Sequence, residues 1–246
     1  MRNFAFAVLS AWSLTSATGG AAVAAPRLAL MYDQQYFCGT CGGAFNHMVY
    51  KQVVDSLNPE TRDIPSIQAG VLAPALVQTD VLFWPFQWDK AMAGDLTPES
   101  VAALKGFVQN GGRLVFKTDY LDTSRHNRDV VEKVFGVHFG MVDNAPAPAF
   151  VCDTQKAQEF GWSTIPVSGT IPFYANFFVG PLPTGAVPLC TVAGGTGYVL
   201  VAMPFGDGVL YFDGGFSQGP TDLSAEQRNI FQQMTEADLV SPHRCF

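Results

Sequence analysis

Two cysteines separated by two residues form the pattern with the clearest chemistry, Cys38-Gly39-Thr40-Cys41. The pair precedes a predicted helix over residues 44–57, and a thiol at a helix N-terminus has a lowered pKa because the helix dipole favours the thiolate. One hypothesis is therefore a thiol–disulfide redox site. The alternative, which we favour, is a structural bridge, either Cys38–Cys41 or one of the two with Cys245, because the rest of the chain lacks thioredoxin features.

A metal site is a further use of these thiols, since His47 lies six residues after Cys41. Structural zinc needs four ligands, and a full set is not visible around this position. The sequence therefore predicts no metal and no cofactor.

The remaining cysteines are Cys152, Cys190 and Cys245. Cys152 and Cys190 flank a segment rich in Pro and Gly and poor in helix, and we predict a structural disulfide between them. An odd count leaves one thiol over or calls for an intermolecular bond.

A second group of residues follows the predicted strands. In open parallel sheets, ligands bind in the crevice beyond the carboxyl ends of the strands. Aromatic rings can stack on the CH faces of a sugar while nearby carboxylates accept its hydroxyl hydrogen bonds. The candidate ligand crevice comprises Asp33, Tyr36, Trp84, Gln87, Trp88, Asp119, Tyr120, Asp122, Asp213 and Phe216.

These residues have two other interpretations. They can be packed loop residues and helix caps, because their position is an expectation from the fold and not a motif. The strand-end carboxylates also permit a hydrolase, a weaker alternative. His126 lies close in sequence to Asp119 and Asp122, but no nucleophile accompanies it, and a solvated histidine at a helix start is the favoured interpretation.

The elements that position these residues are best defined between residues 80 and 117. An apolar strand over 80–86 is followed by a helix over 97–110, a Gly-Gly turn and a second apolar strand over 113–117. Thr97 can cap the helix and Pro98 suits its first position. The apolar residues Val101, Leu104, Phe107 and Val108 recur at helical spacing. This is one crossover unit of a parallel sheet.

Similar patterns predict the other elements. Strands are expected at 27–32, 64–68 and 137–141, and a hairpin at 198–203 and 208–213. Helices are expected at 44–57, 70–77, 124–135 and 223–234. The alternation favours an α/β fold, a doubly wound and mostly parallel flavodoxin-like sheet in which the strands at 27–32, 80–86 and 113–117 are neighbours.

Residues 143–195 are predicted to be an irregular, β-rich insertion. Its aromatic residues are expected to form a core of its own, or an apolar patch for a partner. They are Phe150, Phe160, Trp162, Phe173, Tyr174, Phe177 and Phe178.

The N-terminal residues resemble a targeting segment. Arg2 precedes an apolar run over 4–14, and Ala22-Val23-Ala24 fits a cleavage site, so residues 1–24 are a predicted signal peptide. Residues 25–246 then form a single domain that is secreted or periplasmic. No apolar run is long enough for a membrane span. A net charge of −7 with no basic cluster argues against nucleic acid.

Four stretches together resemble the class I glutamine amidotransferase-like superfamily in its flavodoxin-like form: DVLFWPF, LTPESVAALKGFVQNGGRLVF, VFGVHF and YVLVAMPFGDGVLYFDGGF. The nearest types are the ThuA-like proteins and the similar domain of some β-galactosidases. The resemblance extends over residues 27–238, with 143–195 poorly matched. The family's catalytic Cys, in an elbow after a central strand, and its downstream His-x-Glu have no counterpart here.

The sequence therefore predicts a non-catalytic amidotransferase-like domain that binds a small, sugar-related molecule or a protein partner. The redox function of Cys38 and Cys41 is the alternative from a different class. The sequence carries no signal for an oligomeric state.

Overall fold

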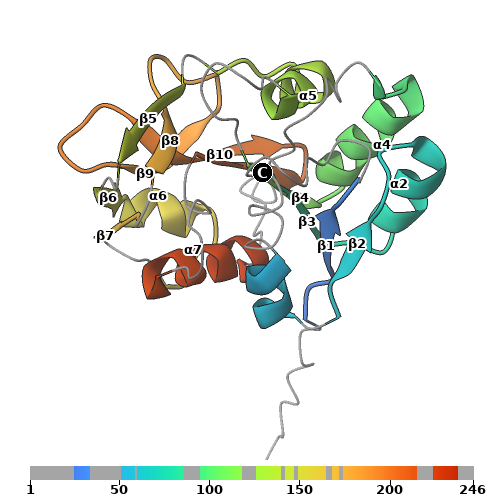
Figure 1. Ribbon diagram of the computed structural model, residues 1–246, viewed down its shortest axis with the longest axis horizontal. Helices are drawn as coiled ribbons and strands as arrows, with labels where there is room; N and C mark the ends of the chain where they lie inside the picture. The colour runs from blue at the N-terminus through green and yellow to red at the C-terminus, as the bar shows by residue number, and fades with distance from the viewer. Residues whose placement is uncertain are drawn as a thin grey trace, which may run out of the picture.

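A computed structural model describes residues 25–33, 51–58, 60–85, 95–117, 126–139, 142–146, 149–164, 168–171, 174–214 and 224–237. These residues form one 11-stranded mixed sheet with helices on both faces (Figure 1). The predicted α/β class is confirmed.

The parallel half of the sheet contains five strands in the order β2-β1-β3-β4-β11. They are β2 (Arg62–Ile64), β1 (Leu28–Met31), β3 (Val81–Trp84), β4 (Arg113–Lys117) and β11 (Gly208–Asp213). The predicted neighbours β1, β3 and β4 pair in parallel. β1 and β3 are buried at every position, as expected for apolar strands covered on both faces.

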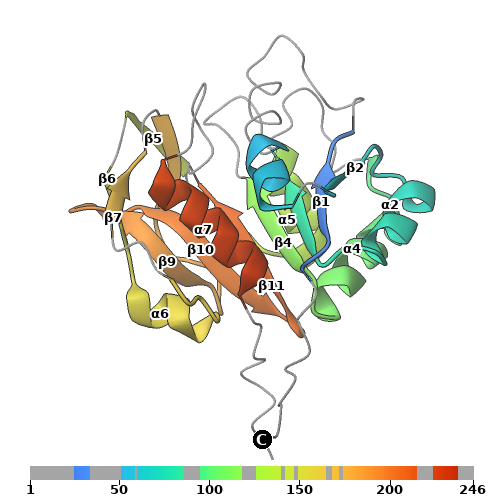
Figure 2. The same cartoon turned by 90° about the horizontal axis from the view of Figure 1, so that it is seen from below.

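Helices cover both faces of this half. α2 (Ala69–Leu76), α4 (Pro98–Gln109) and α5 (His126–Phe135) lie on one face, while α7 (Ala225–Glu236) and the helical residues 51–57 lie on the other (Figure 1). Figure 2 shows α7 running across the face formed by β10 and β11. Side chains alternate between two buried clusters, one on each face.

The helix α4 begins as predicted. The Thr97 side chain accepts a hydrogen bond from the Ser100 amide, and Pro98 stands at the first position. The chain turns after Asn110 at Gly111, which has a φ of 99°. Leu104 and Val108 are fully buried, whereas the predicted core positions Val101 and Phe107 pack at the margin of the cluster.

The antiparallel half begins with β10 (Tyr198–Phe205), which forms the predicted hairpin with β11. β9 (Val187–Val192), β6 (Ala149–Cys152) and β7 (Ser168–Thr170) extend the sheet outward from β10. β8 (Tyr174–Phe178) pairs with β10 and with β5 (Val142–Pro146), and α6 (Thr154–Glu159) follows β6. The segment predicted as an insertion is β-rich, but it is continuous with the central sheet.

The expectation of a separate aromatic core in this segment is wrong. Phe150, Phe160 and Trp162 belong to the same buried cluster as Phe83 and Phe231. Phe178 lies in the cluster on the other face of the sheet. Because β6 and β9 continue the ladder of β10, their apolar side chains extend the existing core and enclose no new one.

Two strand boundaries also differ from prediction. The strand expected at 64–68 occupies 62–64. Residues 137–139 form no strand, and β5 begins at Val142. Val137 and Phe139 are buried and His138 is exposed, so these residues alternate as the residues of a strand do. They pair with no described strand, and Phe139 is buried because it packs on the rings of Phe178 and Phe212.

The predicted disulfide between Cys152 and Cys190 is present. The two residues stand opposite each other in the antiparallel pair β6–β9, with their Cα atoms 4.0 Å apart. The bond therefore ties the outer strands to the sheet across a sequence separation of 38.

Removing this bond with Cys152→Ala and Cys190→Ala should lower the free energy of unfolding by about 2–5 kcal/mol, because the unfolded chain regains loop entropy. Urea unfolding followed by circular dichroism measures the change. Peptide mapping without reduction should recover the two cysteines in one linked fragment. Finding them unlinked would contradict the structure.

A close approach of two turns gives a second prediction. A Cβ atom added to Gly208 would lie 2.2 Å from the carbonyl oxygens of Gly112 and Val108. Gly208→Ala should therefore cost at least about 1–3 kcal/mol, as overpacking does. Gly106→Ala is the control, because its Cβ meets nothing within 4 Å inside α4, and it should gain up to about 1 kcal/mol. Equal stability of the two variants in urea unfolding would refute the close packing.

Candidate functional site

Two neighbouring strands, β4 and β11, end in oppositely charged residues. Lys117 and Asp213 are partners in the parallel ladder, and Lys117 Nζ lies 3.8 Å from Asp213 Oδ1. Both side chains are 0% exposed. Side-chain alternation places them on the same face as Val115 and Tyr211, the face covered by α7. We call the end of the sheet where β1, β3, β4 and β11 finish the carboxyl edge.

A buried ion pair is expensive to assemble. Burial lowers the pKa of Lys117, and the charge of Asp213 opposes that change. The desolvation of two charges often exceeds their mutual attraction, so apolar residues of similar volume would hold the strands equally well. The pair is therefore weak evidence for stability, and we take a functional role as the working hypothesis.

The core beneath the pair is aromatic. Trp162 Nε1 donates a 3.4 Å hydrogen bond to the Tyr211 hydroxyl, and burial raises the pKa of Tyr211. Phe83 of β3 packs on Phe231 of α7 with ring centroids 6.1 Å apart. These contacts pack β11 against the segment after α6, and β3 against α7.

The helix α7 crosses the sheet from β7 to the start of β4. A capping box between Ser224 and Gln227 starts the helix. At its other end Arg113, the first residue of β4, donates hydrogen bonds to the carbonyl oxygens of Thr235 and Ala237. The helix therefore begins beside β7, where Glu226 lies near Gly169, and ends at the first residue of β4.

Three of the predicted crevice residues lie in the described part of the chain: Asp33, Trp84 and Asp213. Asp33 is buried and accepts a 2.9 Å hydrogen bond from the Ile67 amide, so it joins the end of β1 to the segment before α2. Outside the described residues lie Tyr36, Gln87, Trp88, Asp119, Tyr120, Asp122, Phe216, Cys38 and Cys41.

The position of Trp84 differs from that of an open stacking platform. Its side chain is fully buried and stacks on Phe116 with ring centroids 5.4 Å apart. Its indole Nε1 has no hydrogen-bond partner within the described ranges. Trp84 therefore contributes to the core on the α4 side, and the ring offers no face to solvent.

Sequence reasoning did not select Lys117. In the sequence, Lys117 is a charged residue at the end of the apolar stretch Leu114-Val115-Phe116. The ordinary interpretation of such a lysine is a surface residue whose ammonium group reaches solvent. The opposing charge comes from Asp213, 96 positions later, and only the parallel pairing of β4 with β11 brings the two together.

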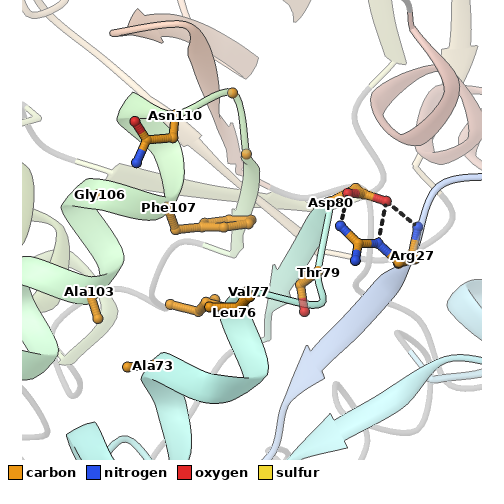
Figure 3. Close-up of a pocket in the computed structure, with 12 residues that line it drawn as sticks. Arg27, Ala73, Leu76, Val77, Thr79, Asp80, Ala103, Gly106, Phe107 and Asn110 are labelled. Carbon is orange, nitrogen blue, oxygen red and sulfur yellow. Dashed lines mark hydrogen bonds and ion pairs between the residues drawn. The ribbon is translucent and has the colours of Figure 1, made fainter.

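A pocket of about 480 Å³ lies at the other end of the sheet (Figure 3). It is lined by residues of α2 and α4 together with Arg27 and Asp80, which precede β1 and β3. We call this end the amino edge. None of the predicted crevice residues lines the pocket.

The described residues contain no group of three or more His, Cys, Asp or Glu placed to hold a metal ion. They also contain no helix that is long and apolar enough to cross a membrane.

The sequence matches no family model and no curated protein. Solved structures are similar in fold. A ThuA-like protein from Bacteroides uniformis superposes with a TM-score of 0.58 at 13% identity, over 87% of this chain and 93% of that one. A cytoplasmic protein from Salmonella typhimurium gives 0.53 at 10% identity, over 85% and 97%.

A β-galactosidase from Bacillus circulans gives a TM-score of 0.59 at 14% identity. The match covers 85% of this chain but only 30% of the enzyme, so the same fold occurs there as part of a longer protein. At identities this low, the superpositions establish a shared fold and nothing further. The chain is thus an α/β domain with a ThuA-like, flavodoxin-like architecture.

The cost of the buried pair can be tested directly. Lys117→Met leaves the Asp213 carboxylate buried without its cation, and we expect a loss of about 3–5 kcal/mol in the free energy of unfolding. Adding Asp213→Leu should restore most of the loss, because both buried charges are then gone. Urea unfolding of the single and double variants measures this. A double variant as unstable as the single one would show that the pair is needed for folding.

Proposed function

We propose that this protein is an exported, non-catalytic ThuA-like domain that binds a small, sugar-related molecule at the carboxyl edge of its sheet. The observation that supports this most is the fully buried pair of Lys117 and Asp213 at the ends of two adjacent central strands. The carboxyl edge is also where open α/β sheets bind their ligands.

The residues after β4 favour binding over catalysis. The resemblance to amidotransferases implies a nucleophilic Cys in an elbow after a central strand. The residues following Lys117 are Thr118-Asp119-Tyr120, and the family's His-x-Glu is also missing. Lys117 and Asp213 stand at this edge as a buried charge pair, which would fix the positions of the residues that follow them.

The chemistry of the carboxyl edge suits a neutral polyol. Lys117 and Asp213 balance each other's charge, and because both side chains are fully buried, the pair would hold the ends of β4 and β11 in place and would not itself contact the ligand. Hydrogen bonds to hydroxyl groups would come from the polar crevice residues predicted from sequence, such as Asp119 and Asp122. The crevice residues predicted from sequence, including Trp88, Tyr120 and Phe216, would add aromatic faces for the CH surface of the ring.

Export is part of the proposal. Cleavage after Ala24 would leave every described contact of the first strand intact, since the Asn58 side chain bonds the Pro26 carbonyl and the Arg27 amide bonds Asp80. The disulfide between Cys152 and Cys190 fits an oxidising compartment. Mass spectrometry of the exported protein should find Ala25 as the first residue, and an intact leader would contradict this.

The binding site is tested with a panel of neutral mono- and disaccharides, measured by isothermal titration calorimetry. We expect at least one sugar to bind saturably, and the variant Lys117→Met with Asp213→Leu to weaken its binding at least tenfold. Lys105→Met is the matched control, because it removes a lysine charge from α4 at a position outside the pair, and it should bind as the wild type does.

Two results would overturn the proposal. Unchanged sugar affinity in the variant Lys117→Met with Asp213→Leu would show that the sugar does not bind at the carboxyl edge. The absence of binding by any sugar would reject sugars as the ligand class. The redox alternative is separated by insulin reduction. Catalytic turnover that disappears in Cys38→Ser with Cys41→Ser would favour the thiol–disulfide function.

A further inference from the structure

The amino-edge pocket between α2 and α4 has the features of a second binding site. We propose that it binds an uncharged, planar aromatic molecule that carries a carbonyl acceptor, such as an aromatic amide. The pocket lies at the opposite end of the sheet from Lys117 and Asp213, so binding there is independent of the proposed function. The volume of about 480 Å³ lies within the range of small-molecule sites.

Two apolar walls of the pocket face each other across a slot. The Phe107 ring of α4 lies opposite Leu76 and Val77 at the end of α2 (Figure 3). The Phe107 ring lies against Gly112, which also lines the pocket, because its ring carbons come within 2.6 Å of the position that a Cβ on Gly112 would take. A ring on one side and aliphatic side chains on the other suit a flat apolar body.

The apolar surface continues beyond the slot. Val77 is 78% exposed and Val71 is 40% exposed, although both belong to the same short helical segment. The helix α2 carries no charged residue on any face. An ordinary surface helix places charged residues toward solvent. The pocket is therefore bordered by exposed apolar surface on the α2 side.

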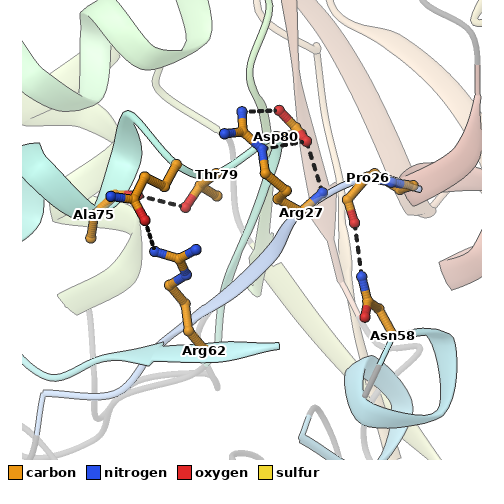
Figure 4. Close-up of polar contacts among 8 residues, drawn as sticks. Pro26, Arg27, Asn58, Arg62, Ala75, Thr79 and Asp80 are labelled. Carbon is orange, nitrogen blue, oxygen red and sulfur yellow. Dashed lines mark hydrogen bonds and ion pairs between the residues drawn. The ribbon is translucent and has the colours of Figure 1, made fainter. Parts of the chain in front are cut away.

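One hydrogen-bond donor at the end of the slot is held ready for a ligand. Arg27 donates to Asp80 from its backbone amide at 2.8 Å, from Nε at 3.0 Å and from Nη2 at 2.6 Å (Figure 4). These three bonds fix the guanidinium plane. Nη1 makes no hydrogen bond within the described residues, and the side chain is 53% exposed. The Thr79 hydroxyl, which also lines the pocket, already donates a hydrogen bond to the Ala75 carbonyl at 2.8 Å.

The surrounding charges favour a neutral head group. Asp80 balances the charge of Arg27. Both α2 and α4 end at the pocket, and neither has a basic residue in its last turn, so their negative dipole ends are uncompensated there. A carboxylate would face these dipole ends and Asp80, while an ammonium group would face Arg27. A carbonyl oxygen can accept from Nη1 without either conflict.

The experiment uses three probes with the same ring: 2-naphthamide, 2-naphthoate and 2-naphthylmethylamine. Binding to the whole protein is followed by naphthalene fluorescence and by chemical shifts of the pocket residues. We expect 2-naphthamide to bind saturably and each charged probe to bind at least tenfold more weakly. Equal binding of the three would overturn the assignment of the head group.

Two glycines provide a matched pair of variants, because a Cβ on Gly106 or on Gly70 meets nothing within 4 Å. Gly106 lines the pocket and Gly70 does not. Gly106→Leu should therefore fill the slot and weaken 2-naphthamide binding at least tenfold, whereas Gly70→Leu should leave it unchanged. Arg27→Lys, which retains the charge beside Asp80 but loses the planar guanidinium, should weaken the amide about fivefold or more.

Three results would refute the pocket. They are the absence of saturable binding up to the solubility limit of 2-naphthamide, undiminished binding to Gly106→Leu, and equal loss in Gly106→Leu and Gly70→Leu. The sugar panel and the naphthalene probes report on different ends of the sheet, so failure of one leaves the other standing.

Discussion

The parallel pairing of β4 with β11 is the contact on which most of the architecture depends. It joins the parallel strands to the antiparallel hairpin of β10 and β11, over five consecutive residue pairs from Arg113–Val209 to Lys117–Asp213. At one end it brings two charges together in the core. At the other end, Arg113 holds the last carbonyls of α7 and so fixes the helix that covers both strands.

The two ends of the sheet use ion pairs in different ways. At the amino edge, Arg27 and Asp80 are half-exposed, and the hydrogen bonds from Arg27 hold the pKa of Asp80 below its usual value. Solvent screens such a pair, so its contribution to stability is small. At the carboxyl edge, Lys117 and Asp213 have no solvent to compensate their desolvation. The buried pair stands at the edge where open α/β sheets generally bind ligands, and the half-exposed pair leaves one guanidinium nitrogen without a hydrogen bond within the described residues, beside a pocket.

The fold itself does not determine the chemistry. Similar architectures occur in a ThuA-like protein of almost the same length and within a β-galactosidase of which this chain matches 30%. Function on such a scaffold depends on the side chains at its edges. Here the sequence lacks the amidotransferase nucleophile after β4, and the ladder places a lysine and an aspartate at the ends of the two central strands.

The sequence by itself determined the local elements and the class of fold. The strand β4, the cap at Thr97 and the hairpin of β10 and β11 depend on short-range patterns, and they are found as predicted. The partner of Cys152 was also predicted, because Cys152 and Cys190 flank a segment rich in Pro and Gly and poor in helix. Only the tertiary structure decided which distant residues meet. Phe150 joined the central core because β6 continues the ladder of β10 and β9, and Trp162 joined it from the turn after α6. Lys117 met Asp213 because β4 and β11 pair in register. Such contacts depend on strand order, which side-chain periodicity does not encode.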